Sequence, residues 1–309
     1  MEKETVYVIG HKSPDTDTVC SAIAYAAYLK KNRINAVPAV SGEINPETKF
    51  VLDKFKFKAP EDIGSAQGKK LVLVDHNEKS QMPDGAEGSK IVEILDHHKV
   101  SFTWPEPITI CTEPLGSTAT LVAKKMLADK KFKMTQQMAG ILVSAILSDT
   151  IVFKSTTTTK IDIETAKKLA KKAKIKDLKK FGIEVKKQKA SLKGLSAEKI
   201  IYSDFKPFEA AGKKFGVGQI EVVELKEAKE RKEELLQKMA EIAQKEGFVL
   251  VALMVTDIIN EGSEFLVSGD AACIEKAFGK KMENNSIYLE KAMSRKKDIL
   301  PPLMRSMEE

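Results

Sequence analysis

Three side chains that can bind a metal ion lie together near the start of the chain, at His11, Asp15 and Asp17. They follow the apolar, β-branched run Val6–Ile9, which is typical of a buried strand with a turn after it. In an open α/β sheet, ligands collect beyond the carboxyl ends of the strands, so these side chains are expected at a binding site. One imidazole and two carboxylates suit a divalent cation of intermediate hardness, such as manganese, cobalt, zinc or magnesium.

The same two aspartates also have a structural interpretation. Aspartate is a common turn former and helix cap, and either Asp17 or Thr18 can cap the helical pattern Cys20–Lys31. This turn alone therefore leaves both interpretations open, and the rest of the chain must distinguish between them.

Further acids and imidazoles end the apolar segments that come later in the sequence. Asp75 closes one such segment and is followed by His76 and Asn77, the triplet Asp96–His98 closes the next, and Asp149 follows a long apolar helical pattern. The chain has four histidines in all, and every one of them lies in these motifs. We therefore predict that the motifs converge on one metal site, at which aspartate could bridge two ions.

The elements that must position these motifs alternate between short strands and helices. Such alternation is the signature of an α/β domain with a mainly parallel sheet covered on both faces. The predicted strands are Val6–Ile9, Ala36–Val40, Leu71–Val74, Ile91–Leu95 and Ile108–Cys111. The predicted helices are Cys20–Lys31, Thr48–Phe57, Thr118–Asp129 and Gln136–Leu147.

The second half of the chain repeats an α/β pattern after a break. A polar stretch with serine and glycine predicts a hinge at 190–194, and with 309 residues two domains are expected, at 1–189 and 195–309. The strands predicted in the second domain are Phe205–Ala210, Gly216–Val223, Phe248–Asp257 and Glu264–Ser268. A long helix is predicted at Leu225–Glu246 and a short one at Ala271–Phe278.

Composition limits the choice of partner only weakly. The net charge of +7 and the pI near 9.0 are compatible with a polyanion such as nucleic acid. Much of the excess lies at 167–193, where lysines recur on a helical pattern without aromatic residues, which indicates a solvated helix face. Three widely spaced cysteines fit a reduced cytoplasm better than a disulfide framework, and no apolar stretch approaches the ~20 residues of a membrane span.

The ordered set of motifs resembles the DHH phosphoesterase superfamily. The set consists of His11-x-x-x-Asp15-x-Asp17, Val74–Asn77, Asp96–His98 and Ser148–Asp149. The later motif Ser294–Lys297, with the length and the two-domain layout, resembles the family II inorganic pyrophosphatases over essentially the whole chain. That resemblance implies a cytoplasmic, metal-dependent hydrolase of pyrophosphate. Its amino-terminal DHH domain would carry the metals, and a smaller DHHA2-type domain with a mixed sheet would bind substrate and close over it.

The resemblance also implies a role for each site residue. His11 and Asp15 would hold one metal ion, and Asp75 would bridge it to a second. The second ion would be held by Asp17, His97 and Asp149. The phosphate contacts and the catalytic groups would be His98, Lys206, Arg295 and Lys296. Two Mn²⁺ or Co²⁺ ions per subunit, Mg²⁺ bound with the substrate, and a homodimer formed through the amino-terminal domain are implied, without nucleic acid or membrane as partners.

The chemistry of pyrophosphate explains why such residues are needed. A nucleophile that approaches this dense anion meets repulsion, and two metal ions ~3.5–4 Å apart can hold a water between them, lower its pKa and aim it in line. Arg295 offers a fork of donors, Lys296 a mobile point charge, and His98 a hydrogen bond or a proton. Asp96 is expected to orient a histidine without binding metal, and His76 to have a structural role.

Two other classes of function stay open at this point. Another DHH phosphoesterase, such as an exopolyphosphatase, an oligonucleotide nuclease or a cyclic-dinucleotide phosphodiesterase, would share the metal motifs. Nuclease relatives typically carry a glycine-rich motif in the carboxy-terminal domain, whereas the glycines here are dispersed. A non-catalytic nucleic-acid-binding module would use the lysine runs, but it would need aromatic residues among them for stacking.

Overall fold

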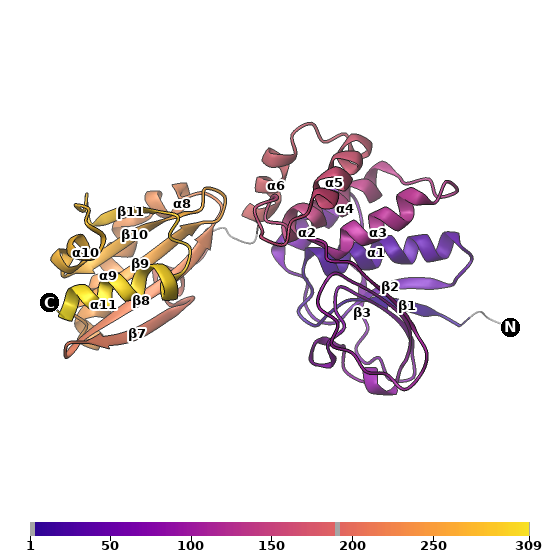
Figure 1. Ribbon diagram of the computed structural model, residues 1–309, viewed down its shortest axis with the longest axis horizontal. Coiled ribbons are helices and arrows are strands. Elements are labelled where there is room, and N and C mark those ends of the chain that lie inside the picture. Colours follow the sequence, from indigo (N-terminus) through magenta and orange to yellow (C-terminus); the bar gives the residue numbers. More distant parts are fainter. Residues whose placement is uncertain (1–3, 189–191, 309) are drawn as a thin grey trace. The chain divides into compact units, whose positions relative to one another are not determined.

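The strand Val6–Ile9 (β1) lies near the centre of a six-stranded parallel sheet in the computed structural model, which describes residues 4–188 and 192–308 (Figure 1). The strand order is β3-β2-β1-β4-β5-β6, and every neighbouring pair is parallel. The other strands are Ala36–Val40 (β2), Glu61–Asp62 (β3), Lys70–Val74 (β4), Lys90–Asp96 (β5) and Thr109–Thr112 (β6). The predicted mainly parallel sheet is confirmed, with the short β3 as an addition.

Helices flank this sheet, as predicted. They are Thr16–Lys31 (α1), Pro46–Lys54 (α2), Thr118–Ala128 (α3), Gln136–Asp149 (α4), Lys160–Ala173 (α5) and Leu178–Lys187 (α6). The helix α1 packs against both α3 and α4. The opposite face of the sheet is covered mainly by connections. Leu71 and Leu73 of β4 belong to a buried cluster with Met82, and Phe102 and Trp104 pack on that cluster.

The start of α1 differs from the prediction. The helix begins at Thr16, and its cap is Asp15, whose Oδ1 accepts the backbone N–H of Thr18 at 2.9 Å. Asp17 and Thr18 were expected as candidate caps, but both lie inside the helix. The carboxylate of Asp17 instead accepts the backbone N–H groups of Thr118 and Ala119, at the start of α3. A contact with a segment so distant in sequence is invisible to a local cap pattern.

The carboxy-terminal unit contains a five-stranded mixed sheet, which confirms the second part of the fold prediction. The order is β11-β10-β9-β8-β7; β8 and β9 are parallel and the other pairs are antiparallel. The strands are Phe205–Ala210 (β7), Lys213–Val222 (β8), Leu250–Asp257 (β9), Gly262–Gly269 (β10) and Ser286–Glu290 (β11). The central strand β9 is buried along its whole length, and its alternate residues face two separate hydrophobic clusters.

Helices cover both faces of this second sheet (Figure 1). They are Ala197–Tyr202 (α7), Lys226–Glu230 (α8), Lys232–Glu246 (α9), Ala271–Phe278 (α10) and Leu300–Glu308 (α11), and a π-helical turn, Arg295–Ile299, precedes α11. The single long helix predicted at Leu225–Glu246 is divided at Arg231. The helix α11 was not predicted, because Pro301 and Pro302 in its sequence are normally read as helix breakers, although proline is tolerated in a first turn.

The chain divides into two compact units, residues 1–189 and 190–309. Residues 190 and 191 of the predicted hinge lie outside the described residues. No helix in the described part of the chain is both long enough and apolar enough to cross a membrane.

Candidate active site

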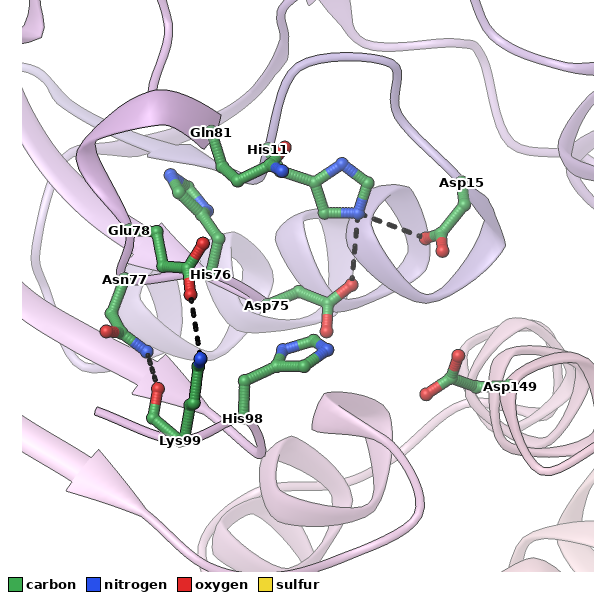
Figure 2. A pocket seen from close by; sticks show the side chains of 10 residues that line it. All are labelled: His11, Asp15, Asp75, His76, Asn77, Glu78, Gln81, His98, Lys99 and Asp149. Atoms are coloured by element: carbon green, nitrogen blue, oxygen red, sulfur yellow. Dashed lines mark hydrogen bonds and ion pairs between the residues drawn. The ribbon is translucent and has the colours of Figure 1, made fainter. Parts of the chain in front are cut away.

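The carboxyl ends of three neighbouring strands bring the predicted ligands together. His11 follows β1, Asp75 follows β4, and His97 follows β5, while Asp149 is the last residue of α4. A cavity of about 460 Å³ opens at this edge of the sheet, and His11, Asp75 and Asp149 are among its lining residues. Figure 2 shows that these side chains come from separate elements and point toward a common space. The parallel sheet therefore supplies the convergence that the sequence motifs suggested.

His11, Asp15 and Asp75 form the first potential metal position. The Nε2 atom of His11 lies 3.8 Å from Oδ1 of Asp15 and 3.7 Å from Oδ2 of Asp75 (Figure 2). The other ring nitrogen, Nδ1, is 2.7 Å from the carbonyl oxygen of Lys12, so it takes the proton of the neutral ring. That hydrogen bond leaves the lone pair of Nε2 directed at the two carboxylates, which is the orientation a metal-binding histidine needs.

His97, Asp149 and Asp17 form the second position in a similar way. The Nε2 atom of His97 lies 3.3 Å from Oδ2 of Asp149 and 3.5 Å from Oδ1 of Asp75. Its Nδ1 atom is 2.9 Å from the carbonyl oxygen of Leu115. One ligand atom each from Asp17, His97 and Asp149 lies within 4.8 Å of the others. Both histidines thus use Nδ1 on a backbone carbonyl and present Nε2 to acids.

Asp75 lies between the two positions. Its Oδ2 atom faces His11, and its Oδ1 atom faces His97. The backbone of Asp75 has a φ of 66°, a left-handed conformation that is uncommon for a residue other than glycine. Such strain persists only where the surroundings enforce it, and it is concentrated at functional sites. The side chain is 3% exposed, so its charge has little solvent to screen it.

The crowding of acids changes their proton affinities. Burial and the negative charges of Asp17 and Asp15 raise the pKa of Asp75 well above its ordinary value. Desolvation and the same two charges raise the pKa of Asp149 to about 9. Burial also raises the pKa of Asp17, although His97 opposes this effect. Divalent cations would remove the repulsion, so these oxygen and nitrogen donors fit two such ions.

His98 is oriented by its neighbour in the same motif. The Oδ1 atom of Asp96 accepts a hydrogen bond from Nδ1 of His98 at 2.9 Å, and Oδ2 accepts one from Asn77 at 2.6 Å. The hydrogen bond to Asp96 raises the pKa of His98. Burial would raise the pKa of Asp96, but its hydrogen bonds from His98 and Asn77 lower it below the ordinary value. His98 lines the cavity beside Asp75, with Nε2 available to a ligand (Figure 2).

His76 lines the same cavity but is turned away from Asp149 (Figure 2). Its Nδ1 atom is 3.0 Å from the carbonyl oxygen of Val74, and its Nε2 atom is buried without a hydrogen-bond partner among the described residues. Burial lowers the pKa of His76 to about 4, so the ring is neutral near pH 7. It belongs to none of the three-residue groups that could hold a metal in the described part of the chain.

Several residues that support the acids were not predicted as such from the sequence. Thr18 and Thr118 donate to Asp75, and their positions at helix starts after acidic or serine residues were the only local signal. Glu47 of α2 is 2% exposed; it accepts a hydrogen bond from Ser148 and lies 3.2 Å from Nζ of Lys186. This ion pair lies next to Asp149 in the structure, and no pattern in the sequence connects its two members.

A second cavity, of about 440 Å³, lies in the carboxy-terminal unit. Its lining includes all three basic residues predicted there, Lys206, Arg295 and Lys296. The guanidinium of Arg295 is almost fully buried and donates to both carboxylate oxygens of Asp204, at 2.9 and 3.0 Å. It also donates to the carbonyl oxygens of Asp204 and Val217. The guanidinium group that was predicted to bind phosphate is therefore already hydrogen-bonded to other groups of the protein.

Comparison with known proteins agrees with this geometry. The model of the DHH family, N-terminal domain, matches residues 5–146, and that of the DHHA2 domain matches residues 183–306. The chain is 48% identical to the manganese-dependent inorganic pyrophosphatase of Methanocaldococcus jannaschii, with 97% of this chain and 98% of the relative covered. It is 45% identical to that of Methanothrix thermoacetophila and 36% identical to that of Bacillus subtilis, again over nearly the full lengths.

A solved structure gives the same assignment. A Methanococcus jannaschii protein assigned to the family II inorganic pyrophosphatases aligns with a TM-score of 0.64 and 47% identity, and the alignment covers 97% of this chain and 99% of that one. Sequence motifs, sheet topology and full-length similarity thus agree. The chain belongs to the manganese-dependent, family II inorganic pyrophosphatases of the DHH superfamily.

Proposed function

We propose that this protein hydrolyses inorganic pyrophosphate to two phosphates in a manganese-dependent reaction. The observation that carries the proposal is the placement of Asp75, whose two oxygens face two separate sets of metal ligands. His11 and Asp15 complete one set; the other is completed by Asp17, His97 and Asp149. The relatives named above are manganese-dependent pyrophosphatases, and this chain matches them over nearly their whole lengths, which supports the same activity here.

The two ions would supply Lewis acidity, because bound metal lowers the pKa of water and neutralises charge that develops on phosphoryl oxygens. The protein's own contribution begins with the oriented histidines. Nε2 of His98 faces the cavity because Nδ1 is held by Asp96, so it can donate a hydrogen bond or a proton to a phosphate oxygen. Pyrophosphate and the phosphate leaving group are both anions. A protonated imidazole at this point would therefore assist the binding of the substrate and the departure of the leaving group during hydrolysis.

The basic cavity of the carboxy-terminal unit supplies the second half of the proposal. Lys206 and Lys296 carry flexible ammonium groups suited to phosphate oxygens, and Arg295 adds a fixed positive charge at the cavity wall. We propose that the two units close over pyrophosphate, exclude water and combine the metals with these cations. Opening would then release the two products. The divalent metals on one unit and the cations on the other make catalysis depend on that closure.

Several further features belong to the same proposal. Each subunit would bind two Mn²⁺ or Co²⁺ ions, Mg²⁺ would accompany the substrate, and the protein would act in the cytoplasm. A homodimer would form through the amino-terminal unit. The position of β6 supports the last point, because it is one of the two edge strands of the sheet in the described part of the chain and exposes Ile110. Light scattering in solution would show whether a dimer forms.

The direct test is phosphate release by metal-stripped protein, restored separately with Mn²⁺, Co²⁺, Mg²⁺ or Zn²⁺. We expect little activity without metal and strong recovery with Mn²⁺ or Co²⁺. Tripolyphosphate, short oligonucleotides and cyclic dinucleotides, assayed in parallel, separate this activity from those of other DHH phosphoesterases. Preferential cleavage of any of these compounds over pyrophosphate would contradict the proposal.

A further inference from the structure

Two threonines hold the carboxylate of Asp75 in a nearly symmetrical way. Thr18 donates its hydroxyl to Oδ2 of Asp75 at 2.8 Å and its backbone N–H to Oδ1 of Asp15 at 2.9 Å. Thr118 donates its hydroxyl to Oδ1 of Asp75 at 2.9 Å and its backbone N–H to Oδ2 of Asp17 at 2.6 Å. Each threonine therefore connects Asp75 to one other acid, and each takes a different oxygen of Asp75.

The two threonines correspond to the two metal positions. The oxygen that accepts from Thr18 is the one that faces His11, and Asp15 belongs to that same position. The oxygen that accepts from Thr118 faces His97, and Asp17 belongs with His97. Thr18 and Thr118 come from the first turns of different helices, α1 and α3, so this correspondence is a property of the folded chain.

Packing leaves these hydroxyls little freedom. Thr18 is 1% exposed and Thr118 is fully buried. Gly10, at the end of β1, makes room for Thr18, because a Cβ atom at this glycine would lie 2.1 Å from Cγ2 of the threonine. Buried hydroxyls need a partner, and each of these two has its partner in Asp75. Their positions at helix amino termini also place backbone N–H groups and the positive end of the helix dipole beside the acids.

A carboxylate held in this way has one mode of metal binding. Each oxygen has two lone-pair directions, and one of the two is already used by a threonine hydroxyl. The torsion that turns an aspartate carboxylate is otherwise broad, so a free carboxylate could give both oxygens to one ion. With a hydroxyl on each oxygen, such a rotation would break two buried hydrogen bonds. One oxygen therefore remains directed at each position.

We propose that Thr18 and Thr118 are positioning residues that force Asp75 to bridge two metal ions, with one oxygen for each ion. The proposal rests on the two-metal site of the proposed function and adds what sets its geometry. Each threonine governs the affinity of its own position: Thr18 that of the position with His11, and Thr118 that of the position with His97.

The test replaces each hydroxyl and measures metal binding directly, without any assay of activity. The variants are T18V and T118V, which remove the donor at nearly constant shape, and T18S and T118S, which retain it. Mn²⁺ binding to metal-stripped, full-length protein is measured by calorimetry, and the exchange-coupled pair of Mn²⁺ ions by electron paramagnetic resonance. Circular dichroism shows which variants fold, and an alanine variant replaces any valine variant that does not.

T120V is the matched control, because Thr120 is a fully buried threonine of the same helix α3. Its hydroxyl donates to Asp162, which belongs to none of the metal groups in the described residues. A loss of general packing would affect this variant as much as T118V. A specific role for Thr118 would leave Mn²⁺ binding by T120V unchanged.

We expect each valine variant to weaken one of the two Mn²⁺ sites by about 10- to 100-fold, as is usual when a partner of a metal ligand is removed, and to lose the coupled spectrum. The serine variants should keep both. Unchanged affinities and spectra in both valine variants would overturn the proposal, and so would equal losses in T120V. If the wild-type protein itself bound fewer than two Mn²⁺ ions, the proposed two-metal function would fail first, and the experiment would show this separately.

Discussion

The two cavities of this protein, one in each unit, differ in what their charged groups already contact. The amino-terminal cavity gathers acids whose pKa values are raised by burial and by one another, so without metal ions they tend to keep protons, because their negative charges would repel one another. In the carboxy-terminal cavity, Arg295 already has a carboxylate and two carbonyl oxygens as partners. The acids of the first cavity need cations from outside the protein to neutralise them. The arginine of the second cavity is already neutralised and hydrogen-bonded by the protein itself.

This difference identifies the groups that remain for an anion. Lys206 and Lys296 line the second cavity and have no ion pair within the described part of the chain. An arginine that is engaged on most of its donors contributes charge and a rigid wall, whereas a lysine can move to a ligand. The comparison therefore divides the predicted phosphate clamp into a fixed part, Arg295, and a mobile part, the two lysines.

The largest effect is expected at the residue that both metal positions share. Asp75→Asn keeps the shape of the side chain but removes its charge and replaces one oxygen by an NH2 group, so one position loses its ligand atom and the other keeps only a neutral amide oxygen. We expect pyrophosphate hydrolysis to fall by more than about 100-fold, since even the loss of a residue that only supports a ligand costs 10- to 100-fold. Calorimetry should show weaker binding of both Mn²⁺ ions. Wild-type activity with one ion bound would contradict the view that the first cavity needs a bridged pair.

A smaller effect is expected when only the orientation of His98 is disturbed. Asp96→Asn removes the acceptor charge that holds Nδ1 of His98 but leaves all predicted metal ligands in place. We expect a 10- to 100-fold lower kcat, with two Mn²⁺ ions still bound. His98→Gln is the matched variant and should cost at least as much. If Asp96→Asn lost the metals instead, Asp96 would belong to the metal site and not to the orientation of the histidine.

The amino-terminal cavity could be predicted from sequence because its ligands obey a local rule. Each of His11, Asp75 and His97 follows a strand of a parallel sheet, and such ends meet at one edge. The support for those ligands could not be predicted in the same way. Thr118 lies 43 residues from Asp75 and 101 from Asp17 in sequence, so their contacts exist only in the folded chain.

The carboxy-terminal cavity could be predicted only in part, for the same reason. The basic motif around Arg295 was readable as a cluster of charge, but its carboxylate partner Asp204 is 91 residues away. Nothing in the sequence pairs the two, because a local pattern cannot distinguish a free arginine from one that is engaged. The resemblance to a family predicted which residues line the cavity, and the structure adds which of them is fixed.

A stability measurement would test the division into fixed and mobile cations. Arg295→Ala removes the buried guanidinium that donates to both carboxylate oxygens of Asp204 and to two backbone carbonyl oxygens, and we expect the carboxy-terminal unit to lose about 2 kcal/mol. Amide hydrogen exchange should become faster in β8, which contains Val217, and in β7, which directly follows Asp204. Lys296→Ala is the control. Its free energy of unfolding should stay within about 0.5 kcal/mol of the wild-type value, while its activity should still fall. Equal stability of both variants would remove the distinction.

The fluorescence of Trp104, the one tryptophan of the chain, provides an internal reference for this experiment. It lies in the amino-terminal unit, where it packs on the cluster that includes Leu71 and Leu73. We expect the fluorescence of Trp104 to be unchanged in the Arg295→Ala variant, since the lost contacts all lie within the carboxy-terminal unit. An equal change at Trp104 would mean that the effect is not local.

The last expected effect is a dependence of stability on pH that metal abolishes. Asp17, Asp75 and Asp149 have raised pKa values in the folded state, so above about pH 4 the folded protein keeps protons that the unfolded chain has lost. Stability of the metal-free protein must therefore fall as pH rises, by about 1.4 kcal/mol per pH unit for each proton held in excess. The fall should continue toward pH 9, where Asp149 releases its proton.

The useful window for this measurement is from about pH 7 to about pH 8.5, because His76, with its pKa near 4 in the folded state, is neutral there, and the unfolded chain has lost most of the proton of this side chain. The raised pKa of His98 acts in the same direction as the acids. We expect Tm of the metal-free protein to fall across this window and Tm with saturating Mn²⁺ to stay level, since the ions replace the protons on the acids. Lys206→Ala, in the other cavity, should leave both curves unchanged. A flat curve without metal would mean that the acids of the first cavity do not repel one another, and the contrast between the two cavities would no longer hold.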